Sequence, residues 1–563
     1  MAILPWVFGC QEKVRRAPPK KLNTSAAAEA ITNQNLEEAF GHLDTLDEFN
    51  QETVKHEILG KINRWIFTTQ FDDAWKIDPL VKQLPKEVRD SYRLKDLDTS
   101  ALRDYELRYE MNDQEFTAYR GGDYDYLQGV FWSSRIAKDV TKNGVADPEL
   151  IAWINTAHPK LPVNEKDDLI TASLLFDWSV RSIQLHKVPG VVTPGTTRDT
   201  WECLQLGYGD HVQRSRVFIS LARQRGITVL MLEVPDANDK LVTYTPAALI
   251  GKQLFVFDAL YGLPISTATG TGIATLKEII SEPEVLASMN SEKYKYPLSS
   301  AGFAKASMLI DAPSTALMQA TAMIDKALSG DNKVFMHLRP SEIVDKLKER
   351  SNVVDVRLWE VPYLAEDSVR LRLSDSNLIS EFVFERQISD IESPYGIARM
   401  LHLMCRFDQN LQRNGARQMY LLSRKMDRDM AQLTRTQQIE QLELQGVPLQ
   451  GTPQQIDDYL QRMISSTKMF KELSSYQLGL IALQSSEFDS AIDYFSVRVL
   501  KEFPESVFRS STHYNLGRAY MAKAQGEETE KYLALAIEQL THEDDLVSPQ
   551  RRGNTLLAER LGK

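Results

Sequence analysis

Residues 201 to 227 read WECLQLGYGDHVQRSRVFISLARQRGI. Gly207 to Gly209 form a turn signal, and Asp210 after them is a residue type that often caps the start of a helix. Apolar residues at helical spacing follow, namely Val217, Phe218, Leu221 and Ala222. Gly226 stands where a C-cap glycine is expected. The segment therefore predicts a Gly-rich turn followed by a helix that ends near Gly226.

The segments on both sides complete a pattern of helix and strand. A helix is predicted over residues 168 to 185, because Leu169, Ala172, Leu175, Phe176, Val180 and Ile183 share one face. After Gly226, residues 228 to 234 read TVLMLEV, which is typical of a buried strand. Residues 252 to 258 read KQLFVFD and predict a second strand, which ends in Asp258.

This order of elements resembles the transglutaminase-like superfamily, which has a papain-like α+β fold. The likeness is clearest at LQLGYGDH, residues 204 to 211, and continues at Ser215, Leu221, Arg223 and Gly226-Ile227. Members usually show Gly-x-Gly-Asp-Cys here, a small residue four positions later and Arg-x-x-Gly-Ile at the helix end. Phe176-Asp177-Trp178 in the preceding helix adds to the likeness, which covers roughly residues 165 to 270.

The resemblance implies a catalytic set that this chain does not keep. In the family, a Cys at the helix start is the nucleophile; the helix dipole and a nearby His stabilise its thiolate, and an acid orients that His. Here His211 occupies the Cys position, and residues 241 to 246, LVTYTP, contain no His where the family would have one. Only Asp258 remains. An imidazole cannot form a thioester, so His211 and Asp258 are expected to mark a degenerate, non-catalytic site.

Two alternatives would retain chemistry at this position. Cys203 could be the nucleophile, but it precedes the Gly-containing turn and is more typical of a small buried hydrophobe. His211 could bind a metal with Asp210 and Asp258 and activate water, but no other His or Cys lies at ligand spacing. We expect no metal and no cofactor. The alternative function is a cysteine- or metal-dependent amide hydrolase or acyltransferase with an altered active site.

The N-terminus reads MAILPWVFGC and is followed by a basic, proline-containing stretch. Its end, Val7-Phe8-Gly9-Cys10, resembles that of a bacterial lipoprotein signal peptide, in which a small residue precedes the Cys that becomes lipidated. The segment departs from that pattern because no Lys or Arg precedes Cys10, which a start codon upstream of Met1 would explain. The resemblance implies a chain anchored to the membrane of the cell envelope through lipidated Cys10. The alternative is a cytoplasmic scaffold with an incidental thiol.

Length and composition indicate several globular domains. The 563 residues predict roughly three to four of them. A content of 43% hydrophobic and 25% charged residues is ordinary for a globular protein. The net charge of -11 disfavours nucleic acid as a partner, because phosphate contacts need clustered Lys and Arg. Three cysteines, Cys10, Cys203 and Cys405, are too few for a disulfide framework or a Cys-rich zinc site.

We therefore expect a multidomain α+β chain. Its segments are a signal remnant and tether over 1–24, an α-rich region over 25–160, a transglutaminase-like core over 161–275, a mixed helical and β-meander extension over 276–445, and a C-terminal α-solenoid over 454–563. Helical patterns dominate residues 26 to 69, 281 to 350 and 394 to 442. Alternating apolar and polar residues over 353 to 386 predict three antiparallel strands.

Residues 454 to 563 carry a repeat. Leu478, Gly479, Ala482, Ala491 and Phe495 form one unit, and Leu516, Gly517 and Tyr520 begin a second. The spacing resembles tetratricopeptide repeats, in which small residues let two helices approach and large ones fill the gap. Flanking helices near 455 to 470 and 547 to 560 are expected to cap the stack, and a generic pair of helical hairpins is the alternative.

These observations predict a function in binding. A site without its nucleophile and a repeat without chemistry favour a non-catalytic transglutaminase-like protein. It would act as an extracytoplasmic, membrane-tethered scaffold whose repeat tail binds a protein or peptide.

Overall fold

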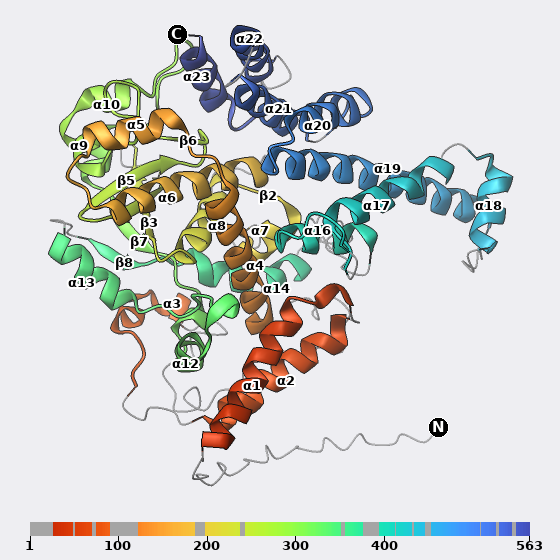
Figure 1. Ribbon diagram of the computed structural model, residues 1–563, viewed down its shortest axis with the longest axis horizontal. Helices are drawn as coiled ribbons and strands as arrows, with labels where there is room; N and C mark the ends of the chain where they lie inside the picture. The colour runs from red at the N-terminus through yellow and green to blue at the C-terminus, as the bar shows by residue number, and fades with distance from the viewer. Residues whose placement is uncertain are drawn as a thin grey trace, which may run out of the picture.

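The computed structural model describes residues 26–48, 51–69, 75–89, 122–185, 197–236, 242–350, 355–374, 393–410, 413–430, 433–444, 452–506, 508–524, 528–542 and 548–562. These residues form a helix-rich protein of mixed α and β structure with one six-stranded sheet (Figure 1). Cys10 and the predicted tether over 1–24 lie outside the described residues.

The six-stranded sheet has the order β6-β5-β4-β3-β7-β8. Neighbouring strands are antiparallel except β7 and β8, which are parallel. The strands are β3 Thr228–Pro235, β4 Val242–Ile250, β5 Gln253–Asp258, β6 Leu263–Pro264, β7 Ser307–Ile310 and β8 Val356–Leu358. Consecutive residues Leu230, Met231 and Leu232 of β3 are fully buried, so both faces of the sheet are covered at its centre. The two predicted strands over 228–234 and 252–258 are confirmed.

Three helices lie directly before the central strands: α6 Val163–Ser182, α7 Thr200–Leu206 and α8 His211–Arg223. A short parallel pair, β1 Gln184–Leu185 with β2 Tyr208–Gly209, joins the end of α6 to the turn before α8. The rings of Phe176, Phe218 and Phe257 meet with centroids 4.8 to 5.4 Å apart, so α6, α8 and β5 share one aromatic core. Gly226 has φ 73°, as expected for the glycine after this helix.

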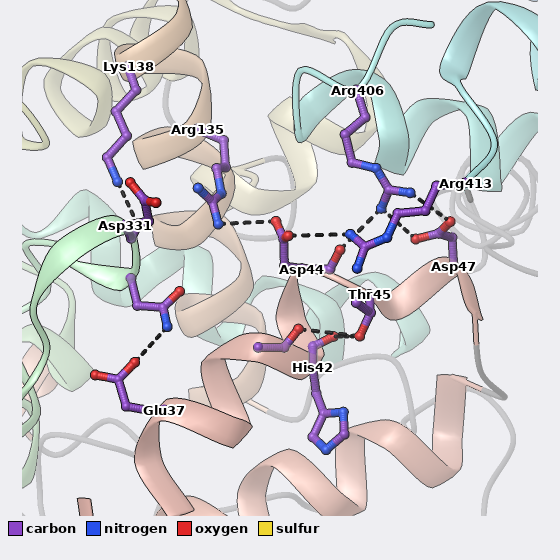
Figure 2. A network of polar contacts seen from close by, with 12 residues as sticks. Glu37, His42, Asp44, Thr45, Asp47, Arg135, Lys138, Asp331, Arg406 and Arg413 are labelled. Atoms are coloured by element: carbon purple, nitrogen blue, oxygen red, sulfur yellow. Dashed lines mark hydrogen bonds and ion pairs between the residues drawn. The ribbon is translucent and has the colours of Figure 1, made fainter. Parts of the chain in front are cut away.

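The described residues of the N-terminal part are mainly helical, as predicted. Its elements are α1 Ala26–Leu43, η1 Leu46–Glu48, α2 Gln51–Thr68, η2 Pro79–Gln83, α3 Lys86–Arg89, α4 Gly122–Asn143 and α5 Pro148–Ala157. Helices α1 and α2 pack as a hairpin at the lower end of the molecule (Figure 1). Figure 2 shows how ion pairs hold the corner after α1: Arg135 and Arg413 both meet Asp44, at 3.1 and 3.6 Å, and Arg406 meets Asp47 at 2.8 Å.

The extension corrects two predictions. Residues 281 to 350 were predicted to be helical, but they also hold the strand β7. The helices of this region are α9 Leu276–Ser281, α10 Pro283–Ala287, α11 Ser300–Ala304, α12 Gln319–Ala327 and α13 Pro340–Arg350. The 3-10 turns η5 Ser314–Leu317 and η6 Gly330–Asn332 lie on either side of α12. In the predicted meander, β8 forms within the first strand, and α14 Val361–Ser374 replaces the second. Buried Val361, Ala365 and Ser368 recur at helical spacing, and Pro362 is tolerated in a first helical turn. The third predicted strand lies outside the described residues.

The helical pattern predicted over 394 to 442 corresponds, in the described residues, to α16 Pro394–Leu403, α17 Ala416–Met430 and α18 Arg435–Leu444. The C-terminal part consists of α19 Pro453–Gln484, α20 Phe488–Asp493 with the π-helical η7 Tyr494–Lys501, α21 Arg509–Lys523, α22 Thr529–Leu540 and α23 Arg551–Leu561. The predicted flanking helix near 455–470 is the first half of α19. Consecutive C-terminal helices pack against one another, and α19 also packs along α17.

Candidate functional site

His211 lies at the N-terminus of α8, where the resemblance locates the nucleophile. Gly207, with φ 76°, ends α7 and allows the chain to turn into β2. Asp210 then caps α8: its Oδ1 accepts from the Gln213 N–H at 2.7 Å, and Gln213 Oε1 accepts from the Asp210 N–H at 3.1 Å. The turn and the helix start predicted from the sequence are both present.

Asp258 lies at the end of β5 and faces a set of internal donors. Its Oδ1 accepts from the N–H groups of Leu260, at 2.9 Å, and Tyr261, at 2.8 Å, and its Oδ2 accepts from the Tyr296 hydroxyl at 2.6 Å. Burial raises the pKa of Asp258, and these hydrogen bonds oppose that rise in part. The carboxylate is therefore committed to contacts within the protein.

His211 and Asp258 are electrostatic neighbours. Burial lowers the pKa of His211, and the carboxylates of Asp210 and Asp258 oppose this effect. The imidazole is therefore held in its neutral form at neutral pH. The two residues that the sequence assigned to one degenerate site thus interact electrostatically, although no hydrogen bond or ion pair joins their side chains in the described part of the chain. Tyr296, the strongest partner of Asp258, was not predicted, because nothing in the sequence relates residues that lie 38 positions apart.

Cys203 lies in α7 and is fully buried. Its Sγ is 3.9 Å from Gln213 Oε1, and burial raises the pKa of the thiol well above its usual value. The charged groups that act on this thiol belong to Arg198, Glu202, Arg216 and Asp210. Both Cys203 and His211 belong to the described part of the chain, and no hydrogen bond joins their side chains there. A thiol in this position is protonated at neutral pH and lacks the base that would activate it.

The described residues contain no cluster of three or more His, Cys, Asp or Glu side chains that could hold a metal ion. The Asp210 carboxylate, one of the metal ligands considered from the sequence, accepts the N-cap hydrogen bond of α8 through Oδ1.

The C-terminal helix α23 covers the turn beside Asp258. A Cβ on Gly553 would lie 1.8 Å from the Tyr261 carbonyl oxygen, so the helix backbone rests directly on this turn. The buried Arg214, one turn after His211 in α8, donates to Ala259 O at 2.9 Å and to Gln550 Oε1 at 2.8 Å. The surroundings of the site are thus closed by the C-terminal part of the chain.

A second buried arginine fastens α7 to α19. Arg399 of α16 donates through Nε to Leu204 O and Gln205 O, both at 3.1 Å, and through Nη1 to Gln477 Oε1 at 2.8 Å. Gly207 packs against the same guanidinium: a Cβ there would lie 3.2 Å from Arg399 Nη2. Sequence reasoning identified neither arginine, because an isolated Arg in a helix is usually solvated.

The predicted repeat residues are mostly in the core. Buried members are Leu478, Ala482, Ala491, Phe495 and Leu516, and Tyr520 is half-buried. A Cβ on Gly479 would lie 2.5 Å from the Phe495 ring, and one on Gly517 would lie 3.0 Å from Leu540. Both glycines therefore stand at close helix contacts.

No helix among the described residues combines the length and apolar character needed to cross a bilayer. Comparison with protein-family models, with curated proteins and with solved structures found no match for this chain. The likeness of residues 201 to 227 to the transglutaminase-like superfamily therefore stays a prediction from the residues.

Proposed function

We propose that this protein is a non-catalytic relative of the transglutaminase-like superfamily that acts as a membrane-tethered, extracytoplasmic scaffold. The proposal rests on the positions and contacts of the three candidate catalytic residues, His211, Asp258 and Cys203. His211 stands at the position that the resemblance gives the nucleophile, Asp258 accepts from Tyr296 and from two backbone N–H groups, and the Cys203 thiol is buried against Gln213. None of these groups is set up to attack an amide.

Two features support the papain-like assignment of the core. Helix α8, which begins at His211, packs against β3 and β4. The adjacent strand β5 ends in Asp258, whose carboxylate acts electrostatically on His211 at the start of α8. A chain that keeps this framework without the thiol is suited to recognition rather than to covalent catalysis.

The C-terminal helices supply the binding function. The close contacts at Gly479 and Gly517 are the kind that tetratricopeptide-like units use to bring helices together. Beside them, a cavity of about 600 Å³ opens between α17 and the helical segment α20–η7. Its lining carries charges of both signs, including Arg424, Asp489, Asp493 and Arg498. Such a surface fits a polar peptide segment of a partner protein.

The alternative is an amide hydrolase or acyltransferase that uses Cys203. Burial of the thiol and its raised pKa weigh against this alternative, because the thiolate is the reactive species. The reactivity of Cys203 toward iodoacetamide in the folded chain separates the two functions.

The tether is tested by lipid labelling. When the chain is expressed in bacteria grown with radiolabelled palmitate, we expect label on the wild type and none on Cys10→Ala, because Cys10 is the proposed acceptor. Cys203→Ala is the matched control and should keep the label, since that thiol is buried. An unlabelled wild type, or label that survives in Cys10→Ala, would rule out the tether.

A further inference from the structure

A cavity of about 550 Å³ lies where three segments distant in sequence meet. These segments are the end of α4, residues 405–410 and 414 after α16, and the end of α19. The residues that decide its chemistry are Asp139, Asn143, Phe407, Asn414, Gln484 and Ser486. This cavity shares no lining residue with the His211–Asp258 site or with the cavity of about 600 Å³ between α17 and α20–η7.

One carboxylate in this cavity has no cation beside it. Asp139 accepts hydrogen bonds from the Asn143 amide at 2.8 Å and from the Gln484 amide at 2.7 Å. It forms no ion pair with any residue that the structure describes. Both of its partners are neutral, so the negative charge of Asp139 is uncompensated within the cavity.

The other charged groups of the lining are already paired. Arg406 turns toward the corner after α1, where it meets both carboxylate oxygens of Asp47 at 2.8 and 3.2 Å (Figure 2). Asp408 pairs with Arg417 Nε at 3.1 Å. Neither group neutralises Asp139, and the net charge left over in the cavity is negative.

Helix ends add to this negative potential. Helix α4 ends at Asn143, and α16 and α19 end beside Cys405 and Ser486, which have φ 57° and 61°. Each left-handed residue closes its helix: the Arg406 N–H donates to Leu401 O at 2.9 Å, and the Glu487 N–H donates to Ala482 O at 2.8 Å. Because helix C-termini carry partial negative charge, all three favour a cation in the space between them.

We propose that this cavity binds a primary ammonium group, supplied by a small polyamine or by a lysine side chain of a peptide. An ammonium group has three donors and no acceptor, which matches a carboxylate whose two amide partners are neutral and leave its charge in place. The Phe407 ring in the lining adds a surface that attracts cations. The proposal is independent of the scaffold function, since it rests on different residues.

Isothermal titration of the full chain tests this site with two probes, 1,5-diaminopentane and the peptide acetyl-Gly-Lys-Gly-amide. We expect saturable binding of at least one probe, and a loss of about tenfold or more in affinity in Asp139→Asn, which removes the charge-assisted contact. Binding of the diamine alone identifies a polyamine site, and binding of the peptide identifies a lysine site. The same peptide with an acetylated lysine should bind neither wild type nor variant.

Asp408→Asn is the matched control, because it removes one negative charge from the same lining but one that Arg417 already pairs. Its affinity should stay within about twofold of the wild type. Asn414→Trp retains Asp139 and narrows the cavity, so it should also weaken binding. Equal affinity of Asp139→Asn and wild type, no saturable binding of either probe, or equal binding of the acetylated peptide would overturn the proposal.

Discussion

Replacement of Arg399 by methionine is expected to lower the free energy of unfolding by about 3 to 5 kcal/mol. Arg399 is 1% exposed, and its guanidinium donates to the carbonyls of Leu204 and Gln205 and to the amide oxygen of Gln477. Methionine fills much of the volume but donates nothing. Each buried acceptor left without its donor costs about 1 to 3 kcal/mol, and three acceptors at the lower end, about 1 to 1.7 kcal/mol each, give the expected loss.

Urea unfolding followed by tryptophan fluorescence measures this change as a lower midpoint. Arg413→Met is the matched control, because Arg413 is about one-third exposed and its contact with Asp44 is 3.6 Å long. It should cost about 1 kcal/mol or less. If Arg399→Met unfolds at the same urea concentration as Arg413→Met, Arg399 does not hold α7 to α19.

Removal of the Asp311 side chain is the second substitution with a large expected effect. Arg216 Nε meets Asp311 Oδ2 at 2.8 Å, and the two side chains are 1% and 6% exposed. Burial by itself would lower the pKa of Arg216. The nearby carboxylates of Asp311 and Asp199 have the larger combined effect, so the pKa of Arg216 is raised above its usual value. Arg216 therefore stays charged, and Asp311→Ala should cost about 3 to 5 kcal/mol by leaving a buried cation without its partner.

A double-mutant cycle isolates the pair. Arg216→Met combined with Asp311→Ala should recover part of the loss, because no isolated charge remains. Glu502→Ala is the control, since its two partners, Arg498 and Lys471, are 45% and 28% exposed and water can replace these contacts. That change should cost about 0.5 kcal/mol or less. An Asp311→Ala variant as stable as Glu502→Ala would show that the ion pair does not anchor α8.

The local part of the fold could be predicted from the sequence, because short-range signals determine it. The Gly-Tyr-Gly-Asp turn and the apolar spacing after it correctly predicted α8, and the apolar runs predicted β3 and β5. Strand β7 was missed because it has only four residues and gains its stability from β3, far away in the chain. The alternation near residue 370 favoured a strand, but tertiary burial of Val361 and Ala365 selected a helix.

The candidate site could be predicted only in part. Its local half, His211 at a helix start, follows from residues 207 to 211. Its distant half does not: Tyr296 and Gln550 reach the site from elements that sequence spacing cannot relate to it. The periodicity of α8 indicated one buried face, whereas Arg214 and Arg216 on its polar side are also buried through hydrogen bonds to remote carbonyls.

The central claim, that the Cys203 thiol beside the candidate site is not activated, is tested most directly by the rate at which iodoacetamide modifies Cys203 in the folded chain at neutral pH. Peptide mass spectrometry follows Cys203, with the urea-unfolded chain and N-acetylcysteine as references. We expect modification at least about a hundredfold slower than in the unfolded chain, because the thiol is buried and protonated. Rapid, selective modification of Cys203 in the folded chain, faster than that of N-acetylcysteine, would contradict the claim and favour a thiol enzyme.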